Sequence, residues 1–224
     1  ADWALNYDKQ ELENLLKILK DKTIGGIADN VKYDNSLLSE QSRSMLYMGE
    51  AWSTLFITEF RNKKFAKKEG RNFFVNYRQG GMPFYVTIWR KKACGKQFTP
   101  ADDAERMLEM LEKGYKIAVN PANSKPLFIQ TTSEIDASSL YRQKLRGFIS
   151  NKQIKTEKKE FNVSTGGFYI PLMIYTLLNL HRAKSIKAAI GIILWNAITF
   201  TAFLKSVTIN DFDTKKNWTM RIKR

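Results

Sequence analysis

The sequence has very few of the residues that hold metal ions or form disulfide bonds. Its 224 residues include one cysteine, Cys94, and one histidine, His181. No disulfide can form within such a chain, and a metal site built from cysteine and histidine would have at most two ligands. This excludes zinc-finger, zinc-ribbon and zinc-deaminase proteins. The low cysteine content also favours a reducing compartment, so we expect an intracellular, cytoplasmic protein.

The sequence also lacks the signatures of common enzyme classes. It contains no phosphate-binding Walker loop, no Gly-x-Ser-x-Gly nucleophile motif and no protein-kinase motif. The acids at 102–105 and 134–136 do not form an evident metal-binding constellation. We therefore expect no catalytic residue, no metal and no cofactor. A metal-dependent endonuclease or a replication protein of a mobile element is the enzymatic alternative.

The basic charge is strong and unevenly distributed. The net charge is +15 at pH 7. Residues 61–100 carry 11 basic side chains and one acid, and residues 141–224 carry 16 basic side chains and four acids. A protein with this charge repels itself in its compact state unless a polyanion neutralises it. Folding that joins the two basic regions would therefore create a groove for a polyanion.

Helical patterns dominate the first two thirds of the chain. Apolar residues at helical spacing and capping residues predict four helices. Their expected ranges are 6–21, 42–68, 100–114 and 138–149. We expect Gly25-Gly26 to break the chain after the first helix, and Gly70 and Gly114 to end the second and third.

Short aromatic and β-branched runs predict a small β element. Residues 72–79 and 82–92 flank Gly80-Gly81 and predict a β-hairpin, and residues 115–120 and 126–132 predict a second pair of strands. The sequence therefore predicts an α+β fold that is predominantly helical, with a small antiparallel β-hairpin element.

The last third of the chain is strongly apolar. Residues 161–180 and 188–204 contain no charged residue, and seven residues separate them. We expect two buried helices packed as a hairpin, with Pro171 near the start of the first. Their lengths approach the roughly 20 residues that span a bilayer, but polar residues and the short connection argue against spanning. A membrane partner is therefore not expected, and a membrane-associated basic protein is a further alternative.

The charged run 151–160 is expected to be an exposed connection. It suggests a helical N-terminal lobe with the basic hairpin, 1–150, and a helical C-terminal lobe, 151–224. The two lobes could also form one compact unit with a groove between them.

A set of basic and aromatic side chains is the candidate nucleic-acid site. A basic run at the end of the second helix leads into the predicted hairpin, which interleaves aromatic and basic residues as proteins do to stack bases and hold phosphates. Basic residues of the fourth helix would line the other wall of the groove. The candidates are Arg61, Lys63, Lys64, Lys67, Lys68, Arg71, Tyr77, Arg78, Arg90, Lys91, Lys92, Lys96, Arg142 and Arg146.

These observations predict a protein that binds nucleic acid with little sequence preference. We expect single-stranded RNA as the partner in preference to DNA. Apolar residues near both ends would let the chain form homo-oligomers through its terminal segments. These residues are Trp3, Leu5, Tyr7, Phe212, Trp218 and Met220. A viral nucleocapsid or packaging protein that oligomerises on RNA is the most concrete form of this hypothesis, with the virion as a second location.

Overall fold

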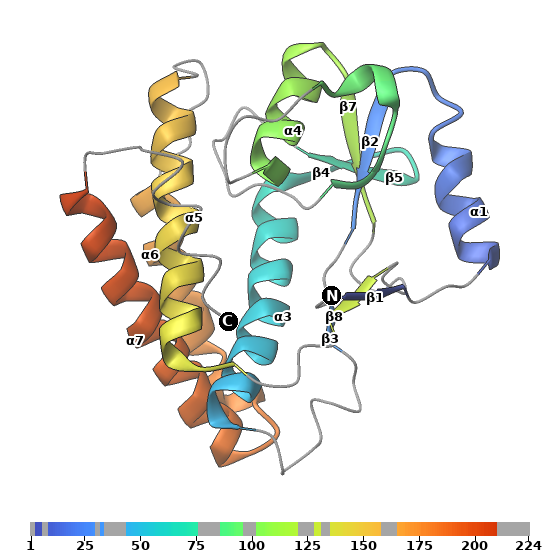
Figure 1. The fold of residues 1–224 in the computed structure, drawn as a ribbon. Helices are drawn as coiled ribbons and strands as arrows, with labels where there is room; N and C mark the ends of the chain where they lie inside the picture. Colours follow the sequence, from blue (N-terminus) through green and yellow to red (C-terminus); the bar gives the residue numbers. More distant parts are fainter. Residues whose placement is uncertain are drawn as a thin grey trace.

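The computed structural model of the chain is mixed α/β and predominantly helical, with a small sheet beside a bundle of helices (Figure 1). The predicted α+β class is therefore confirmed. The structure describes residues 3–5, 9–29, 32–33, 44–75, 86–95, 102–120, 128–130, 135–157 and 165–209.

A five-stranded sheet forms one end of the molecule, at the top of Figure 1. Its strands lie in the order β4-β5-β7-β2-β6, and β7 and β2 are its parallel neighbours while the other pairs are antiparallel. The strands are β2 (Ile24–Ala28), β4 (Ala66–Glu69), β5 (Asn72–Val75), β6 (Val86–Trp89) and β7 (Lys116–Val119). A smaller sheet has the order β1-β8-β3, with β1 at Trp3–Leu5, β3 at Lys32–Tyr33 and β8 at Phe128–Gln130.

The predicted strand pairings are wrong. β5 pairs with β4 across a turn at Gly70 and Arg71, while β6 lies at the opposite edge of the sheet. Gly70 has a φ of +62°, a conformation that suits glycine because it has no Cβ, so it forms the turn of a hairpin. The expected pairing of 115–120 with 126–132 also fails, because β7 and β8 belong to different sheets.

Gly25-Gly26, the predicted break, lies inside β2. A Cβ on Gly25 would lie 2.7 Å from the Cβ of Tyr115, and one on Gly26 would lie 2.8 Å from Cγ1 of Val86. Glycine is needed here because neighbouring side chains approach the strand closely.

Two helices cover the faces of the five-stranded sheet (Figure 1). On one face lies α1 (Lys9–Ile18), and on the other lies α4 (Asp102–Glu112). Each contributes apolar residues to the core beneath it, which are Leu15, Ile18 and Leu19 on the α1 side and Met107, Leu108 and Met110 on the α4 side. Both faces of the sheet are therefore packed.

The remaining helices form the bundle. They are α3 (Met45–Phe65), α5 (Ala137–Glu157), α6 (Thr165–Leu178) and α7 (Ile186–Thr208), with the short 3-10 helices η2 (Lys91–Ala93) and η3 (Leu180–Arg182) in connections. The described parts of both apolar segments are helical as predicted. The two helices are not fully buried, since Ile174 and Ile193 are exposed, α7 packs chiefly against α3 and α5, and Pro171 lies inside α6. Serine side chains cap the starts of α3 and α7, where Ser44 and Ser185 accept hydrogen bonds from backbone amides.

The helix α5 is longer than predicted. It continues to Glu157, so the described part of the expected connection at 151–160 is helical, and Ile154 is buried. The helix therefore runs through residue 150, the expected boundary between lobes. The main core contains buried residues from both sides of that position, among them Met110 and Trp195.

Candidate nucleic-acid interface

The basic run at the end of α3 continues directly onto the β4–β5 hairpin. Lys63 and Lys64 lie in the last turn of α3, Lys67 and Lys68 lie in β4, and Arg71 lies in the turn between the strands. All five side chains are exposed. The predicted run of surface charge is therefore present on one helix end and the hairpin that follows it.

Arg61 does not share this surface. Its side chain is 1% exposed, although it lies in the same helix one turn before Lys64. A buried guanidinium does not reach a phosphate outside the protein. We therefore leave Arg61 out of the proposed binding surface.

Arg90 is bound by three backbone carbonyl groups. Its Nε donates a hydrogen bond to the carbonyl oxygen of Ile24 at 2.7 Å, and its Nη2 donates to those of Asp21, at 2.9 Å, and Leu19. Leu19 and Asp21 lie in the turn that follows α1, and the carbonyl oxygen of Asp21 also accepts a hydrogen bond from the backbone amide of Ile24. The arginine therefore joins β6 to the connection between α1 and β2.

This contact brings together lysines that are distant in sequence. Leu19 and Asp21, whose carbonyl groups bind Arg90, follow α1. Lys20 lies between them, and Lys22 comes directly after Asp21. Lys91 and Lys92 follow Arg90 in η2, and all four lysines are exposed. Lys20 and Lys22 are not predicted from the sequence, because they lie in a region that is acidic overall and no local pattern reveals what Arg90 binds.

Lys116 connects these lysines with the β4–β5 hairpin. Its Nζ lies 2.6 Å from Oε2 of Glu69 in β4 and 5.1 Å from the centre of the Phe74 ring in β5. Its backbone amide donates to the carbonyl oxygen of Thr23, at the start of β2. Lys67 lies opposite Phe74 in the strand register, on the same side of the sheet as Lys116. Lys116 is likewise not predicted from the sequence.

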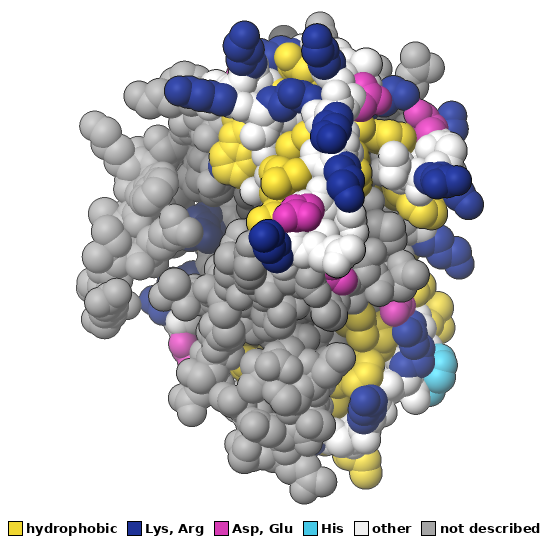
Figure 2. All heavy atoms as spheres, turned by 90° about the vertical axis from the view of Figure 1, so that its right-hand side faces the viewer, with side chains coloured by type: hydrophobic (Ala, Val, Ile, Leu, Met, Phe, Trp, Pro, Cys, Tyr) yellow, Lys and Arg dark blue, Asp and Glu magenta, His cyan; other side chains and the backbone are white. Residues whose placement is uncertain are grey.

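We call the resulting set of exposed lysines the basic surface. Its members are Lys20, Lys22, Lys67, Lys91, Lys92 and Lys116. Figure 2 shows Lys and Arg side chains gathered over the upper part of this face, among hydrophobic side chains of the sheet end of the molecule.

Two acids lie among these lysines, and both have lowered pKa values with contributions from neighbouring cations. The hydrogen bond from Lys116, together with the charges of Lys116 and Lys67, holds the pKa of Glu69 below its ordinary value against the opposing effect of burial. Hydrogen bonds from Thr23 lower the pKa of Asp21, with further contributions from the charges of Lys116 and Arg90. Neighbouring cations favour the ionised form of a carboxyl group, and they would attract an added phosphate in the same way.

Trp89 is an exposed aromatic residue on the edge strand β6, and its side chain lies on the α4 side of the sheet, opposite Lys67 and Lys116. It directly precedes Arg90 on β6, and its side chain is 41% exposed. The guanidinium carbon of Arg106 lies 4.1 Å from its ring centre, a cation–π contact that holds the indole in place. The exposed part of a fixed indole is suited to stacking against a base.

The other predicted hairpin residues divide into two groups. Phe73 and Phe74 pack against the core on opposite faces of the sheet, so both are structural. Tyr77, Arg78 and Lys96 lie outside the residues that the structure describes.

Arg142 and Arg146 lie on α5 and do not join the basic surface. Between them, Lys144 forms an ion pair of 3.3 Å with Glu50, near the start of α3. Lys63 lies at the other end of α3, about 20 Å further along at 1.5 Å per residue. The expected second wall of a groove is therefore not placed beside the first basic run.

The acids considered for a metal site have other positions. Asp136 caps α5 by accepting a hydrogen bond of 2.8 Å from the backbone amide of Ser139, and Glu105 is buried. Glu134 and the side chains of Asp102 and Asp103 are outside the described part of the structure. Within that part, no group of three or more His, Cys, Asp or Glu side chains is placed to hold a metal ion.

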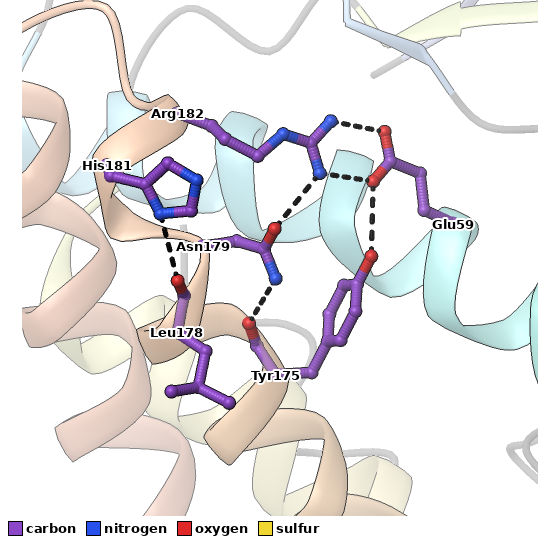
Figure 3. Close-up of polar contacts among 6 residues, drawn as sticks. All are labelled: Glu59, Tyr175, Leu178, Asn179, His181 and Arg182. Atoms are coloured by element: carbon purple, nitrogen blue, oxygen red, sulfur yellow. Dashed lines mark hydrogen bonds and ion pairs between the residues drawn. The ribbon is translucent and has the colours of Figure 1, made fainter.

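The histidine belongs to a polar cluster that fastens the connection between α6 and α7 to α3 (Figure 3). Arg182 forms two parallel hydrogen bonds with Glu59, at 2.7 and 2.8 Å, and Tyr175 donates to the same carboxylate at 3.4 Å. The carboxylate of Glu59 raises the pKa of Arg182. The Nδ1 atom of His181 lies 3.0 Å from the carbonyl oxygen of Leu178, which places this residue at the end of a helix as expected.

No protein-family model matches the sequence, and neither a curated protein nor a solved structure matches it.

Proposed function

We propose that this chain binds the phosphate backbone of single-stranded nucleic acid, with little sequence preference, through the basic surface. The observation that carries the proposal is the convergence of exposed lysines from the α1–β2 connection, β4, η2 and β7 around Arg90 and Lys116. Phosphate binding requires many like charges on one surface, and the energy comes largely from the release of counterions.

The types of side chain favour binding without base recognition. Lysine ammonium groups are compact point charges that bind phosphate oxygens, and phosphate contacts carry no sequence information. Where a strand passes the edge of the sheet at β6, Trp89 on the α4 side would add stacking, which tolerates every base because each has an aromatic face. We favour single-stranded RNA over DNA as the ligand, and we retain a packaging role as its most concrete form.

The basic surface can extend onto the neighbouring hairpin and helix end. Exposed cations continue from Lys67 to Lys68, Arg71, Lys63 and Lys64. A strand that crosses the sheet from η2 to β4 would meet them at its far end. Oligomerisation through the termini is a separate prediction, and the N-terminal strand β1 already pairs with β8 in the same chain.

The test is a binding titration by fluorescence anisotropy, with labelled single-stranded RNA, single-stranded DNA and duplex at several salt concentrations. One variant replaces Lys20, Lys22, Lys91 and Lys92 by Gln. The control replaces four other exposed lysines by Gln, namely Lys9, Lys17, Lys184 and Lys205. Both variants lose the same charge, so a difference between them reports position and not net charge.

We expect the wild type to bind single strands with an affinity that falls steeply as salt rises. The binding constant falls as salt rises, and a plot of its logarithm against the logarithm of the salt concentration has a negative slope. Loss of four phosphate contacts should make this slope less steep, by up to about 3 for a single strand. The control should keep most of the wild-type slope. Equal losses in the two variants, or no binding at low salt, would contradict the proposal. Degradation of the probe in the presence of Mg²⁺ would instead support the enzymatic alternative.

A further inference from the structure

The helix α7 has an exposed apolar face. Seven large apolar side chains on it are 42–81% exposed, namely Ile186, Ile190, Ile193, Leu194, Phe200, Leu204 and Val207. At 100° per residue they fall within about 140° of the helix circumference, so they form one continuous strip. Single exposed apolar residues are normal on a soluble protein, whereas a strip along a whole helix marks an interaction surface.

The opposite side of α7 is fully engaged with the protein. Ile192, Trp195 and Ala202 are almost completely buried there. The helix is long and apolar enough to cross a bilayer, but 39% of its most apolar segment is buried inside the protein. A helix that packs on a protein with one side and is apolar on the other is suited to lying in the plane of a membrane surface.

The charged residues of α6, α7 and the connection between them are all basic. Residues 161–210 contain no Asp or Glu. Lys184 lies just before α7, Lys205 lies in its last turn, and both are exposed. Long lysine side chains at the ends of an apolar strip can extend to lipid phosphates while their methylene groups stay in apolar surroundings. An anionic lipid surface therefore complements this face in charge as well as in polarity.

The same charges disfavour a second copy of the chain as the occupant. Each copy carries a net charge of +15. In a symmetric antiparallel pair of α7 helices, Lys184 of one copy would lie near Lys205 of the other. Like charges at both ends of the contact, added to the overall repulsion, oppose such a pair.

We propose that the apolar face of α7 binds the surface of an anionic lipid bilayer, with the helix axis in the membrane plane. The apolar side chains enter the boundary between headgroups and acyl chains to a depth of about 5–10 Å, and Lys184 and Lys205 bind anionic headgroups. Exposed residues of α6, such as Ile174 and Leu178, are 53% and 71% exposed and add apolar surface next to α7.

The experiment measures binding of the full-length chain to vesicles of phosphatidylcholine, with and without phosphatidylglycerol. Ile193→Glu alters the apolar face, and Leu16→Glu on α1 is the matched control, because the two side chains are 49% and 45% exposed. We expect the wild type to bind anionic vesicles, Ile193→Glu to lower this binding at least tenfold, and Leu16→Glu to change it less than twofold. Circular dichroism checks that both variants fold.

A second measurement separates this face from the basic surface, which could also attract anionic vesicles. A polarity-sensitive fluorophore is attached to Ala197→Cys on the exposed face of α7, in a Cys94→Ser background, and to Gln143→Cys on α5 as control. We expect anionic vesicles to shift the emission to the blue at 197 and not at 143. Vesicle binding without this shift would overturn the proposal. The proposal would also be overturned if Ile193→Glu and Leu16→Glu lowered binding to anionic vesicles equally.

Self-association that Ile193→Glu abolishes, without vesicle binding by the wild type, would also overturn it and identify a second copy as the occupant. Nucleic-acid binding is measured in parallel with the same variants. Ile193→Glu should leave it unchanged, so the two proposals fail independently.

Discussion

Gly49 of α3 and Gly191 of α7 lie in direct backbone contact where the two helices cross. A Cβ atom on Gly49 would overlap the carbonyl group of Gly191, and one on Gly191 would overlap the carbonyl oxygen of Met45. The neighbouring atoms are backbone atoms, which cannot move aside by a change of rotamer. The two glycines therefore set the close approach of the helices, and the buried residues Met48 and Ile192 pack around this contact.

Gly49→Ala should destabilise the chain strongly. Overpacking of a tight core costs about 1–3 kcal/mol, and we expect the upper end of this range because helix backbones must separate. Gly147→Ala in α5 is the control, since a Cβ there would meet nothing within 4 Å. That change should raise the free energy of unfolding by about 0.5–1 kcal/mol, because alanine favours a helix. Urea unfolding followed by circular dichroism measures both, and equal effects would contradict the role of the crossing.

Glu50→Gln should also destabilise the bundle. Glu50 is buried, forms an ion pair of 3.3 Å with Lys144, and accepts a hydrogen bond from Nε1 of Trp195. Removal of its charge leaves a mostly buried ammonium group without its counterion, which costs about 3 kcal/mol. The double variant Glu50→Gln/Lys144→Met should be more stable than the single one. Urea unfolding tests this, and a double variant less stable than Glu50→Gln would refute the coupling.

Arg90→Ala should weaken folding more than phosphate binding. Its guanidinium group donates to three carbonyl groups, and hydrogen bonds from charged groups contribute about 1.5–3 kcal/mol each. We expect a loss of about 2–3 kcal/mol in the free energy of unfolding, less than the sum for three such bonds, because Arg90 is only partly buried and water can replace part of what is lost. Lys91→Ala, one residue later and exposed, should stay within about 0.5 kcal/mol of the wild type. Thermal unfolding of the two variants decides between a structural arginine and a surface cation.

Asp21 should make stability depend on pH in the acid range. Hydrogen bonds from Thr23 hold its pKa in the folded chain below the ordinary value of 3.8. A lowered pKa means that the ionised form stabilises the fold, so the contribution is complete above pH 3.8 and is lost as pH falls through the folded pKa. Asp21→Asn should therefore be less stable than wild type at neutral pH, and the difference should shrink below pH 3.8. A difference in unfolding free energy that is independent of pH would contradict this assignment.

The helices were predictable because their signals are local. Apolar spacing and charge-free segments lie within the helices themselves, and α3 and α7 were correctly identified by them. The end of α5 was missed, because the charged side chains after residue 150 resemble a loop while buried contacts such as that of Ile154 keep the chain helical.

Strand pairing was not predictable because it depends on distant residues. The segment at 66–69 continues a lysine-rich helix pattern, yet it forms β4 because β5 offers it a partner. Gly25 and Gly26 resemble a turn, and their role is visible only once Tyr115 and Val86 lie against them. The basic surface has the same origin, since Lys20 and Lys116 join it through contacts of Arg90 and Glu69 with remote parts of the chain.

The helix α3 ends at Phe65 and the strand β4 begins at Ala66, with no residue between them. The element that crosses α7 at Gly49 is thus continuous with the hairpin that carries Lys67. Neither the bundle nor the sheet can be expressed alone without losing a helix or an edge strand that completes its core. Heating should therefore melt the bundle and the sheet in a single cooperative transition, because loss of the glycine crossing in α3 also removes the support of the hairpin that carries Lys67.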